Sequence, residues 1–240
     1  MFFFETLVYP RVEEAAQRAL WRDARDLDIA MARLAADQSA AFILKEMGMA
    51  KAHKDKFALF DAALTRVDPK LNGLFCEFGV WKGETINYIA SKNPTTIHGF
   101  DSFEGLPEDW RAGFQAGMFK IGSIPGVRPN VMLHKGWFKD SLPGFAKAHP
   151  GPLAFAHLDA DLYSSTKDVL DVLGERIVAG TVLQFDEFFN YPGWQEGESK
   201  AFFEFCRTRH AEVEYLGYVP THEQVAVRIK TIAPAAPPRP

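Results

Sequence analysis

The sequence predicts an α/β fold in which a mostly parallel sheet is covered by helices on both faces. After Gly73, short apolar runs alternate with stretches of helical periodicity, which is the pattern typical of such sheets. The chain has 240 residues, 47% of them hydrophobic, which is enough for one such domain with a helical appendage. Two full domains fit this length less well.

The region before the sheet is expected to be helical from about residue 12 to residue 67. Leu27, Met31 and Leu34 recur at i, i+4 and i+7, and Phe57 and Phe60 begin a second set with similar spacing. Turn residues at 68–69 and 72–73 then interrupt the pattern. We therefore divide the chain into an N-terminal helical cap or oligomerisation segment (1–70), an α/β domain (71–231) and an Ala/Pro-rich, disordered tail (232–240).

Within the domain, each strand and helix is predicted from its local pattern. Strands are expected near 74–79, 96–101, 130–135, 152–158 and 180–185, with a final antiparallel pair near 213–219 and 224–230. Helices are expected near 83–91, 141–148, 165–175 and 198–209. In a parallel sheet, ligands bind at the carboxyl ends of the strands, so the functional residues should stand where strands end.

Charge and cysteine content exclude several classes of protein. The formal net charge is −4, so there is no basic surface for nucleic acid, and Lys51 to Lys56 form a short basic cluster expected to be a solvated helix face. Cys76 lies in a predicted strand and is expected to be a reduced, buried thiol. Met1–Phe4 is apolar but lacks the features of a signal peptide, and no run reaches roughly 18 apolar residues. We expect a cytoplasmic protein without nucleic-acid or membrane partners.

A first candidate site follows the first two strands of the domain. Gly79 suits a sharp turn and Gly83 suits close packing at the helix start, but Trp81 between them would obstruct a dinucleotide pyrophosphate. Glu77 suits a cationic ligand, such as the amino end of the methionyl part of S-adenosylmethionine. Asp101 ends the next strand at a spacing suited to ribose hydroxyls, although it could instead be a helix cap or loop acid.

A second candidate site lies after the fourth and fifth strands. Asp159, Asp161, Asp186 and Glu187 follow apolar runs, and unpaired carboxylates packed together would repel one another. Carboxylates converging at adjacent strand ends would form an all-oxygen site for a hard cation such as Mg²⁺. For Asp161 the alternative is a helix N-cap. After the third strand, Trp137 offers a flat face for adenine, or it belongs to the core.

Several motifs resemble the macrocin O-methyltransferase (TylF-type) family. They are the runs 76–85, 99–107 (GFDSFEGLP), 136–138 (GWF), 157–166 (HLDADLYSST) and 185–194 (FDEFFNYPGW), which occur in the order found in that family. The resemblance covers roughly residues 70 to 210. It implies a Rossmann-like, seven-stranded class I methyltransferase sheet, S-adenosylmethionine as cofactor and a divalent metal, usually Mg²⁺. It also implies methylation of a sugar hydroxyl in natural-product biosynthesis.

The resemblance assigns roles to individual residues. It implies that Asp159, Asp186 and Glu187 hold the metal, with Glu187 standing where better-known members often carry Asp. The cofactor site would comprise Glu77, Gly79, Trp81, Gly83, Thr85, Asp101, Ser102, Gly136, Trp137 and Asp159.

Methyl transfer to oxygen depends mainly on positioning, so a catalytic base is sought near the metal. Asp161 is the leading candidate and Asp159 the second, whereas His157 is expected to be a hydrogen-bonded core residue. The connections 104–128 and 190–199 are long enough to cover an acceptor. The alternatives are a metal-free methyltransferase, a nicotinamide oxidoreductase and a catalytically silent binding module. A homodimer would explain the apolar N-terminal helices.

Overall fold

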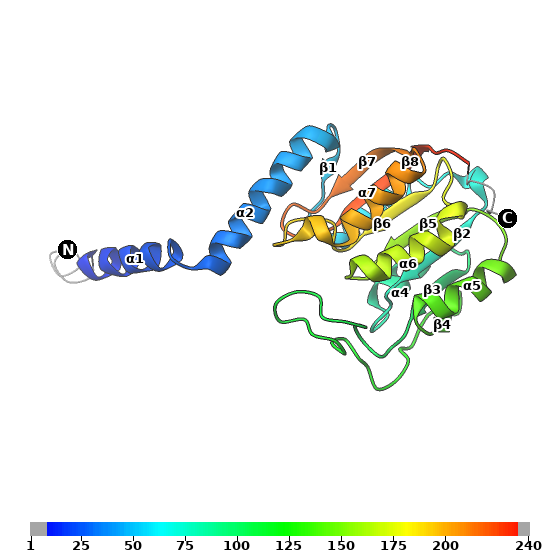
Figure 1. The fold of residues 1–240 in the computed structure, drawn as a ribbon, viewed down its shortest axis with the longest axis horizontal. Coiled ribbons are helices and arrows are strands. Elements are labelled where there is room, and N and C mark those ends of the chain that lie inside the picture. The colour runs from blue at the N-terminus through cyan, green and yellow to red at the C-terminus, as the bar shows by residue number, and fades with distance from the viewer. Residues whose placement is uncertain (1–8, 235–240) are drawn as a thin grey trace.

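The computed structural model describes residues 9–234, and the apolar start Met1–Phe4 and residues 235–240 lie outside this range. At its centre is an eight-stranded sheet with the order β1-β7-β8-β6-β5-β2-β3-β4 (Figure 1). The strands are β1 (Lys51–Ala52), β2 (Leu74–Phe78), β3 (Ile97–Asp101), β4 (Val131–Lys135), β5 (Leu153–Leu158), β6 (Val182–Phe185), β7 (Glu212–Tyr218) and β8 (Val225–Thr231). Neighbouring strands are parallel except that β8 runs antiparallel to β6 and β7.

The mostly parallel sheet and its antiparallel pair are therefore confirmed, and the strand count differs by one. The additional strand is β1, in which Lys51 and Ala52 pair with Gly217 and Tyr218 of β7. A strand of two residues has no periodicity that sequence reasoning can detect. The other seven strands are those predicted, displaced at their ends by one or two residues.

The α-helices are α1 (Tyr9–Asp23), α2 (Leu27–Phe42), α3 (Lys56–Leu64), α4 (Glu84–Lys92), α5 (Phe138–Ala148), α6 (Tyr163–Leu173) and α7 (Glu198–Thr208). Five of the α-helices cover the sheet, α1 projects from the domain, and α2 packs on the domain only through its C-terminal half (Figure 1). Asp26 and Asp55 cap α2 and α3 by accepting hydrogen bonds from backbone N–H groups of the first turn. Helices α5, α6 and α7 pack side by side on one face, and α3 and α4 cover the other.

Strand alternation produces a separate hydrophobic core on each face of the sheet. Phe78 and Phe100 stack at 5.2 Å between ring centroids in the core beneath α5–α7. Phe75 and Phe155 stack at 6.0 Å in the core beneath α3 and α4. Because side chains alternate along a strand, Glu77 falls on the same face as Phe75. This placement matters for the site described below.

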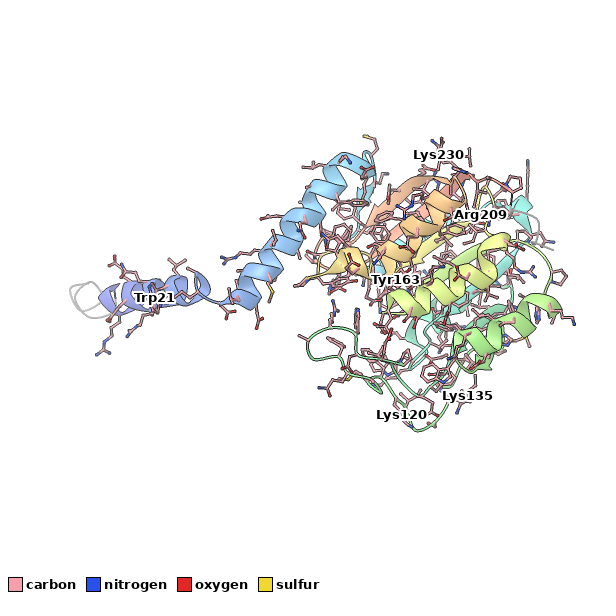
Figure 2. All side chains as sticks on the ribbon, in the orientation of Figure 1. Trp21, Lys120, Lys135, Tyr163, Arg209 and Lys230 are labelled. Atoms are coloured by element: carbon pink, nitrogen blue, oxygen red, sulfur yellow. The ribbon has the colours of Figure 1, made fainter. Side chains whose placement is uncertain are left out.

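The N-terminal segment differs from the prediction in two ways. Helix α1 and the start of α2 project from the domain, and Trp21 on α1 lies far from the sheet (Figures 1 and 2). The end of α2 packs on the domain, with Ser39 buried and Phe42 against Trp194. The apolar stripe is exposed, with Leu27 at 75% and Leu34 at 58% of full exposure, so it does not roof the cavity within this chain. Helix α3, in contrast, packs on β6, β7 and β8, with Phe60 fully buried. The expected domain boundary near residue 70 therefore separates α3 from the sheet on which it packs.

The predicted disorder of the C-terminal tail is wrong for its first residues. Ile232 packs against the core beneath α7. The Ala233 N–H donates a hydrogen bond to the Arg209 carbonyl, and the Arg209 guanidinium donates one to the Ala233 carbonyl, each 2.9 Å long. These contacts extend the domain beyond β8. None of the helices over residues 9–234 combines the length and apolar character of a membrane span.

Candidate active site

A cavity of about 680 Å³ opens at the carboxyl ends of the central parallel strands, where the fold class predicts a ligand site. It brings together residues that follow β2, β3, β4, β5 and β6. Ten of the residues predicted from the sequence line it, namely Gly79, Trp81, Asp101, Ser102, Gly136, Trp137, Asp159, Asp161, Asp186 and Glu187.

The turn after β2 is shaped by Gly79 and Trp81. Gly79 has φ +94°, and a Cβ atom there would lie 1.7 Å from the carbonyl oxygen of Asp159, so no other residue fits. Trp81 has φ +44° and is 43% exposed at the cavity wall, with the ammonium of Lys82 over its ring. The indole therefore lies where a pyrophosphate would approach in a dinucleotide-binding turn.

Asp101 holds the turns after β2 and β3 together. Its Oδ2 accepts hydrogen bonds from the N–H groups of Val80 and Trp81, both 2.8 Å long, and its Oδ1 accepts one of 2.6 Å from Phe103. Asp101 is thus a loop acid, as the alternative interpretation held, and it also lines the cavity. The two descriptions are compatible because each carboxylate oxygen can accept more than one hydrogen bond.

Three residues expected at the cofactor do not line the cavity, namely Glu77, Gly83 and Thr85. Glu77 lies within β2 rather than after it and is fully buried. Its carboxylate accepts a hydrogen bond from Thr85 Oγ1 (3.1 Å) and lies 3.0 Å from His157 Nδ1. The expected direct contact between Glu77 and a cationic ligand is therefore not supported by its position.

His157 is the buried core histidine that the sequence predicted, and it links two carboxylates. Its Nδ1 faces Glu77, and its Nε2 lies 3.5 Å from Asp186 Oδ1. Burial acts to lower the pKa of His157, but the carboxylates of Asp186 and Glu77 outweigh it and raise the pKa to about 10. The imidazolium therefore connects the interior of β2 to the acid at the end of β6.

The four acids after β5 and β6 converge, although not as the predicted set of three. Oxygens of Asp159, Asp161 and Glu187 lie within 4.8 Å of one another, and Asp159, Asp186 and His157 form a second such group. Asp159 belongs to both groups. Asp186 Oδ1 and Glu187 Oε2 are buried and have no hydrogen-bond partner in the described part of the protein.

The electrostatics of this acid cluster reflect burial and mutual repulsion. Burial and the negative charge of Asp186 raise the pKa of Asp159 well above its ordinary value, and burial and Asp159 do the same for Glu187. Burial, followed by the charges of Glu198 and Asp186, raises the pKa of Asp161 to about 8. Carboxyl groups with such raised pKa values are poorly compensated by the rest of the protein.

Asp161 does not cap the following helix. The residue at the N-cap position of α6 is Leu162, and no side chain caps that helix end. Asp161 instead has φ +61° and lies at the centre of a tight turn in which the Leu162 N–H donates to the Ala160 carbonyl at 2.6 Å. Left-handed backbone at a non-glycine residue is strained, and such strain concentrates at functional sites.

The macrocin-O-methyltransferase (TylF) family model matches residues 126–211. This confirms the resemblance over that segment. The match runs from the approach to β4 through α7 and includes the whole acid cluster.

Two curated relatives have similar sequences. One is the 8-demethyl-8-(2,3-dimethoxy-alpha-L-rhamnosyl)-tetracenomycin-C 4'-O-methyltransferase of Streptomyces olivaceus, 32% identical over 48% of this chain and 53% of the relative. The other is the demethyldecarbamoylnovobiocin O-methyltransferase of Streptomyces niveus, 30% identical over 50% of this chain and 54% of the relative. The chain thus spans about half the length of the curated relatives it matches.

Solved structures show the fold. The calicheamicin methyltransferase CalS11 superposes with a TM-score of 0.60 at 26% identity, covering 72% of this chain and 78% of that structure. The O-methyltransferase NovP gives a TM-score of 0.52 at 21% identity, covering 73% and 79%. The fold is that of the class I S-adenosylmethionine-dependent methyltransferases.

Sequence reasoning missed a lysine beside the acid cluster. Lys56 was assigned to a solvated basic face, but it is the first residue of α3 and lines the cavity. Burial lowers the pKa of Lys56, and the charges of Asp186 and Asp159 outweigh this effect and raise it. The neighbouring N-cap Asp55 marks the helix start in the sequence, but nothing in the sequence indicates which way the lysine faces.

The two long connections behave differently from each other. In 104–128, Trp110, Phe114 and Phe119 line the cavity, and Arg111 binds Glu223 through two hydrogen bonds of 2.9 and 3.0 Å. In 190–199, Tyr191 and Trp194 are buried in the core, at 5% and 4% exposure. Connection 104–128 therefore lines the cavity, where an acceptor could bind. Connection 190–199 is instead part of the hydrophobic core.

Proposed function

We propose that this chain is an S-adenosylmethionine-dependent O-methyltransferase that methylates a sugar hydroxyl of a glycosylated natural product, with Mg²⁺ bound at the acid cluster. The observation that carries the proposal is one cavity in which the strand-end residues Asp101 and Trp137 share a wall with Asp159 and Glu187. The two relatives, which are named as O-methyltransferases, support the same reaction class.

The cofactor would occupy the part of the cavity beside β2, β3 and β4. S-adenosylmethionine would supply the methyl group on its sulfonium. Gly79 lines this part of the cavity, Asp101 Oδ1 offers one further acceptor site to a ribose hydroxyl, and Trp137 offers a ring beside Gly136. Glu77 would not contact the cofactor. It would influence the site indirectly, because it pairs with His157, which in turn pairs with Asp186 of the acid cluster.

The acid cluster fits a divalent cation on two observations. Its four carboxylates supply oxygen ligands, with His157 beside Asp159 and Asp186, and Glu187 Oε2 is buried without a hydrogen-bond partner in the described residues. Asp159, Asp186 and Glu187 would hold the ion. A bound cation would supply positive charge that orients the acceptor oxygens and lowers the pKa of the reacting hydroxyl.

Asp161 is the proposed base, and its geometry also makes it a candidate ligand. Its carboxyl oxygen lies within 4.8 Å of ligand atoms of Asp159 and Glu187. In its ionised form, the Asp161 carboxylate would accept the proton of an acceptor hydroxyl bound in the cavity that it lines. Asp159 remains the second candidate base.

The acceptor would enter beneath the connection 104–128. Trp110, Phe114 and Phe119 line the cavity, and their aromatic side chains suit the apolar face of a sugar or an aromatic aglycone. The guanidinium of Arg111 lies 3.9 Å from the centroid of Trp110 and 4.7 Å from that of Tyr191. Together with the Arg111–Glu223 pair, these contacts would hold the connection closed over the acceptor.

Binding and turnover together test this proposal. We expect calorimetric titration to show that the protein binds S-adenosylhomocysteine and not NADH. Purified protein with labelled S-adenosylmethionine and Mg²⁺ should transfer methyl groups to a member of a panel of deoxysugar-bearing macrolide and aminocoumarin glycosides. Binding of NADH in place of S-adenosylhomocysteine would refute the assignment.

We further propose that α1 and α2 form an oligomerisation segment, with a homodimer as the simplest assembly. Leu20, Leu27, Leu34 and Leu44 are each at least 58% exposed, which is unusual for one contiguous region of an unassembled protein. Sedimentation should therefore give a dimer for the full chain and a monomer for the double variant Leu27→Glu and Leu34→Glu, whose substituted side chains are exposed in the single chain. An unchanged particle mass in that variant would contradict this assignment.

A further inference from the structure

One fully buried acid lies outside the proposed cofactor, metal and base assignments. Glu198 is the first residue of α7 and is 0% exposed. Burying a carboxylate is costly unless hydrogen bonds compensate for it. Glu198 therefore requires a structural explanation, and its hydrogen-bond partners supply one.

Both oxygens of Glu198 accept hydrogen bonds, and the donors come from two different loops. Oε1 accepts from the N–H of Ala160 at 3.0 Å and from Thr166 Oγ1 at 3.1 Å. Oε2 accepts from the N–H of Glu187 at 3.3 Å. Ala160 stands between Asp159 and Asp161, so one carboxylate joins the loop after β5 to the loop after β6.

No other side chain among residues 9–234 forms hydrogen bonds to both loops. Backbone hydrogen bonds hold the first residue of each loop, from Asp159 N–H to Phe78 and from Asp186 N–H to Leu158. The loop after β6 is held again at Phe188, whose N–H donates to Glu223, but no backbone hydrogen bond joins the two loops to each other beyond Asp186 in the described residues. Asp161, with φ +61°, also needs its strained turn to be held by its surroundings.

We propose that Glu198 is a positioning residue that sets the separation of the two acid-bearing loops and thereby the affinity of the site for a divalent cation. The cation part of this inference rests on the proposed function. A plain structural role would predict that loss of Glu198 lowers stability without a specific effect on the cation. The loop-spacing role predicts a specific effect, because the ligand oxygens must meet at one point.

Glu198→Gln separates the two halves of this bridge. The Gln side chain keeps one carbonyl oxygen, which can still accept from Ala160 and Thr166, but its amide group places N–H donors against the N–H of Glu187. The loop after β6 should therefore be released while the loop after β5 stays held. Ser199→Ala is the matched control, because Ser199 is equally buried on α7 and donates to Trp194 O (2.7 Å) instead.

The measurement is titration with Mn²⁺ alone, followed by loss of the free-ion electron paramagnetic resonance signal. We expect the Mn²⁺ dissociation constant to rise at least tenfold in Glu198→Gln and to stay within twofold in Ser199→Ala. Affinity for S-adenosylhomocysteine should stay within threefold in both variants. Circular dichroism verifies that each variant is folded. A folded Glu198→Gln variant with Mn²⁺ affinity within twofold of the wild type would overturn the inference.

Two further measurements keep the inference testable. If Glu198→Gln does not fold, Thr166→Val removes one donor to Glu198, and Mn²⁺ affinity should fall two- to fivefold, whereas an unchanged value would overturn the inference. If the wild type binds no Mn²⁺, the proposed cation site fails. Amide hydrogen exchange then decides the loop-spacing role, which requires faster exchange at Glu187 but not at Ala160 in Glu198→Gln.

Discussion

The two halves of the cavity differ in how far the protein satisfies its own polar groups. On the cofactor side, Asp101 accepts three backbone hydrogen bonds and needs nothing further to be stable. On the acid side, Glu187 keeps a buried oxygen without a hydrogen-bond partner among the described residues, and the pKa values of Glu187 and Asp159 are raised well above their ordinary values, whereas His157 compensates Asp186. The cofactor side is thus preorganised by the protein alone, whereas the acid side is electrostatically incomplete.

The largest expected effect is the response of each side to a chelator. Catalysis should be abolished by excess chelator and restored by Mg²⁺, because the acid side depends on a cation for its charge balance. Affinity for S-adenosylhomocysteine should stay within about threefold, since the cofactor side is built from other strand ends. Methyl-transfer assays and calorimetry in parallel test both statements. Full activity in chelator would refute metal dependence and favour a metal-free O-methyltransferase.

The next prediction separates base from ligand on the acid side. Asp161→Asn keeps the shape of the side chain but removes its ability to accept a proton, so turnover should fall by roughly 10²–10⁴. Affinities for Mn²⁺ and S-adenosylhomocysteine should be retained. A tenfold loss of Mn²⁺ affinity instead would identify Asp161 as a ligand, and Asp159 would become the base to test. Asp168→Asn, at the rim of the same cavity, is the control.

A third prediction tests whether the cofactor side is as preorganised as its hydrogen bonds indicate. Asp101→Ala leaves three backbone N–H groups without their acceptor, so the free energy of unfolding should fall by about 1–3 kcal/mol. Affinity for S-adenosylhomocysteine should fall by roughly 10–100-fold, equivalent to about 1.5–3 kcal/mol. Asp109→Ala, which loses an exposed acceptor for Ala116 N–H, is the control. Unchanged affinity in Asp101→Ala would remove it from the cofactor site.

The smallest expected effect is the dependence of stability on pH. Asp161 and Glu198 have pKa values raised to about 8 by burial and neighbouring acids, whereas unfolded carboxyl groups titrate near pH 4. A raised folded-state pKa means that stability is present at low pH and is lost as the pH rises from about 4 through about 8. Because Asp161 is partly accessible, we expect a loss of about 1–3 kcal/mol rather than the full linkage value.

Adding a divalent cation should change the pH dependence of stability on the acid side. Mg²⁺ should cancel most of the loss at pH 8, because a cation stabilises the ionised carboxylates. His98, which lies on β3 below the cofactor side, should behave oppositely. Burial lowers its pKa to about 4, so its contribution to stability is lost as the pH falls from about 6.5. Thermal unfolding between pH 4 and 9, with and without Mg²⁺, measures both trends. A profile insensitive to Mg²⁺ at pH 8 would contradict the proposed cation site.

Much of the domain could be predicted because local patterns and global fold agree there. Apolar strand runs, helix periodicity and turn residues located seven strands and four helices to within a few residues. The rule that ligands bind at strand ends identified Asp101 in a first candidate site and Asp159 and Asp186 in a second, and all three line one cavity. These inferences hold because parallel strands necessarily end at a common edge.

Residues whose role depends on a distant partner could not be predicted in this way. Glu77 lies at the expected position, but strand alternation turns it toward His157 and away from the cavity. Lys56 and Glu198 come from helices whose faces are fixed only when α3 and α7 dock on the sheet. The stripe Leu27, Met31 and Leu34 is helical, as its spacing predicted. Its exposure could not be predicted, because it follows from the position of the start of α2 away from the rest of the chain.

The sequence by itself therefore determined the fold class, the edge of the sheet that carries the site and the acidic character of that site. Periodicity and strand-end position are local properties of the chain, and physical chemistry connects them directly to burial and to shared edges. Only the tertiary structure decided that Asp186 reaches Glu77 through His157 and that Glu198 joins the two acid-bearing loops. Those contacts join residues far apart in sequence, and they exist only once the sheet has aligned its strands and the helices have packed against it.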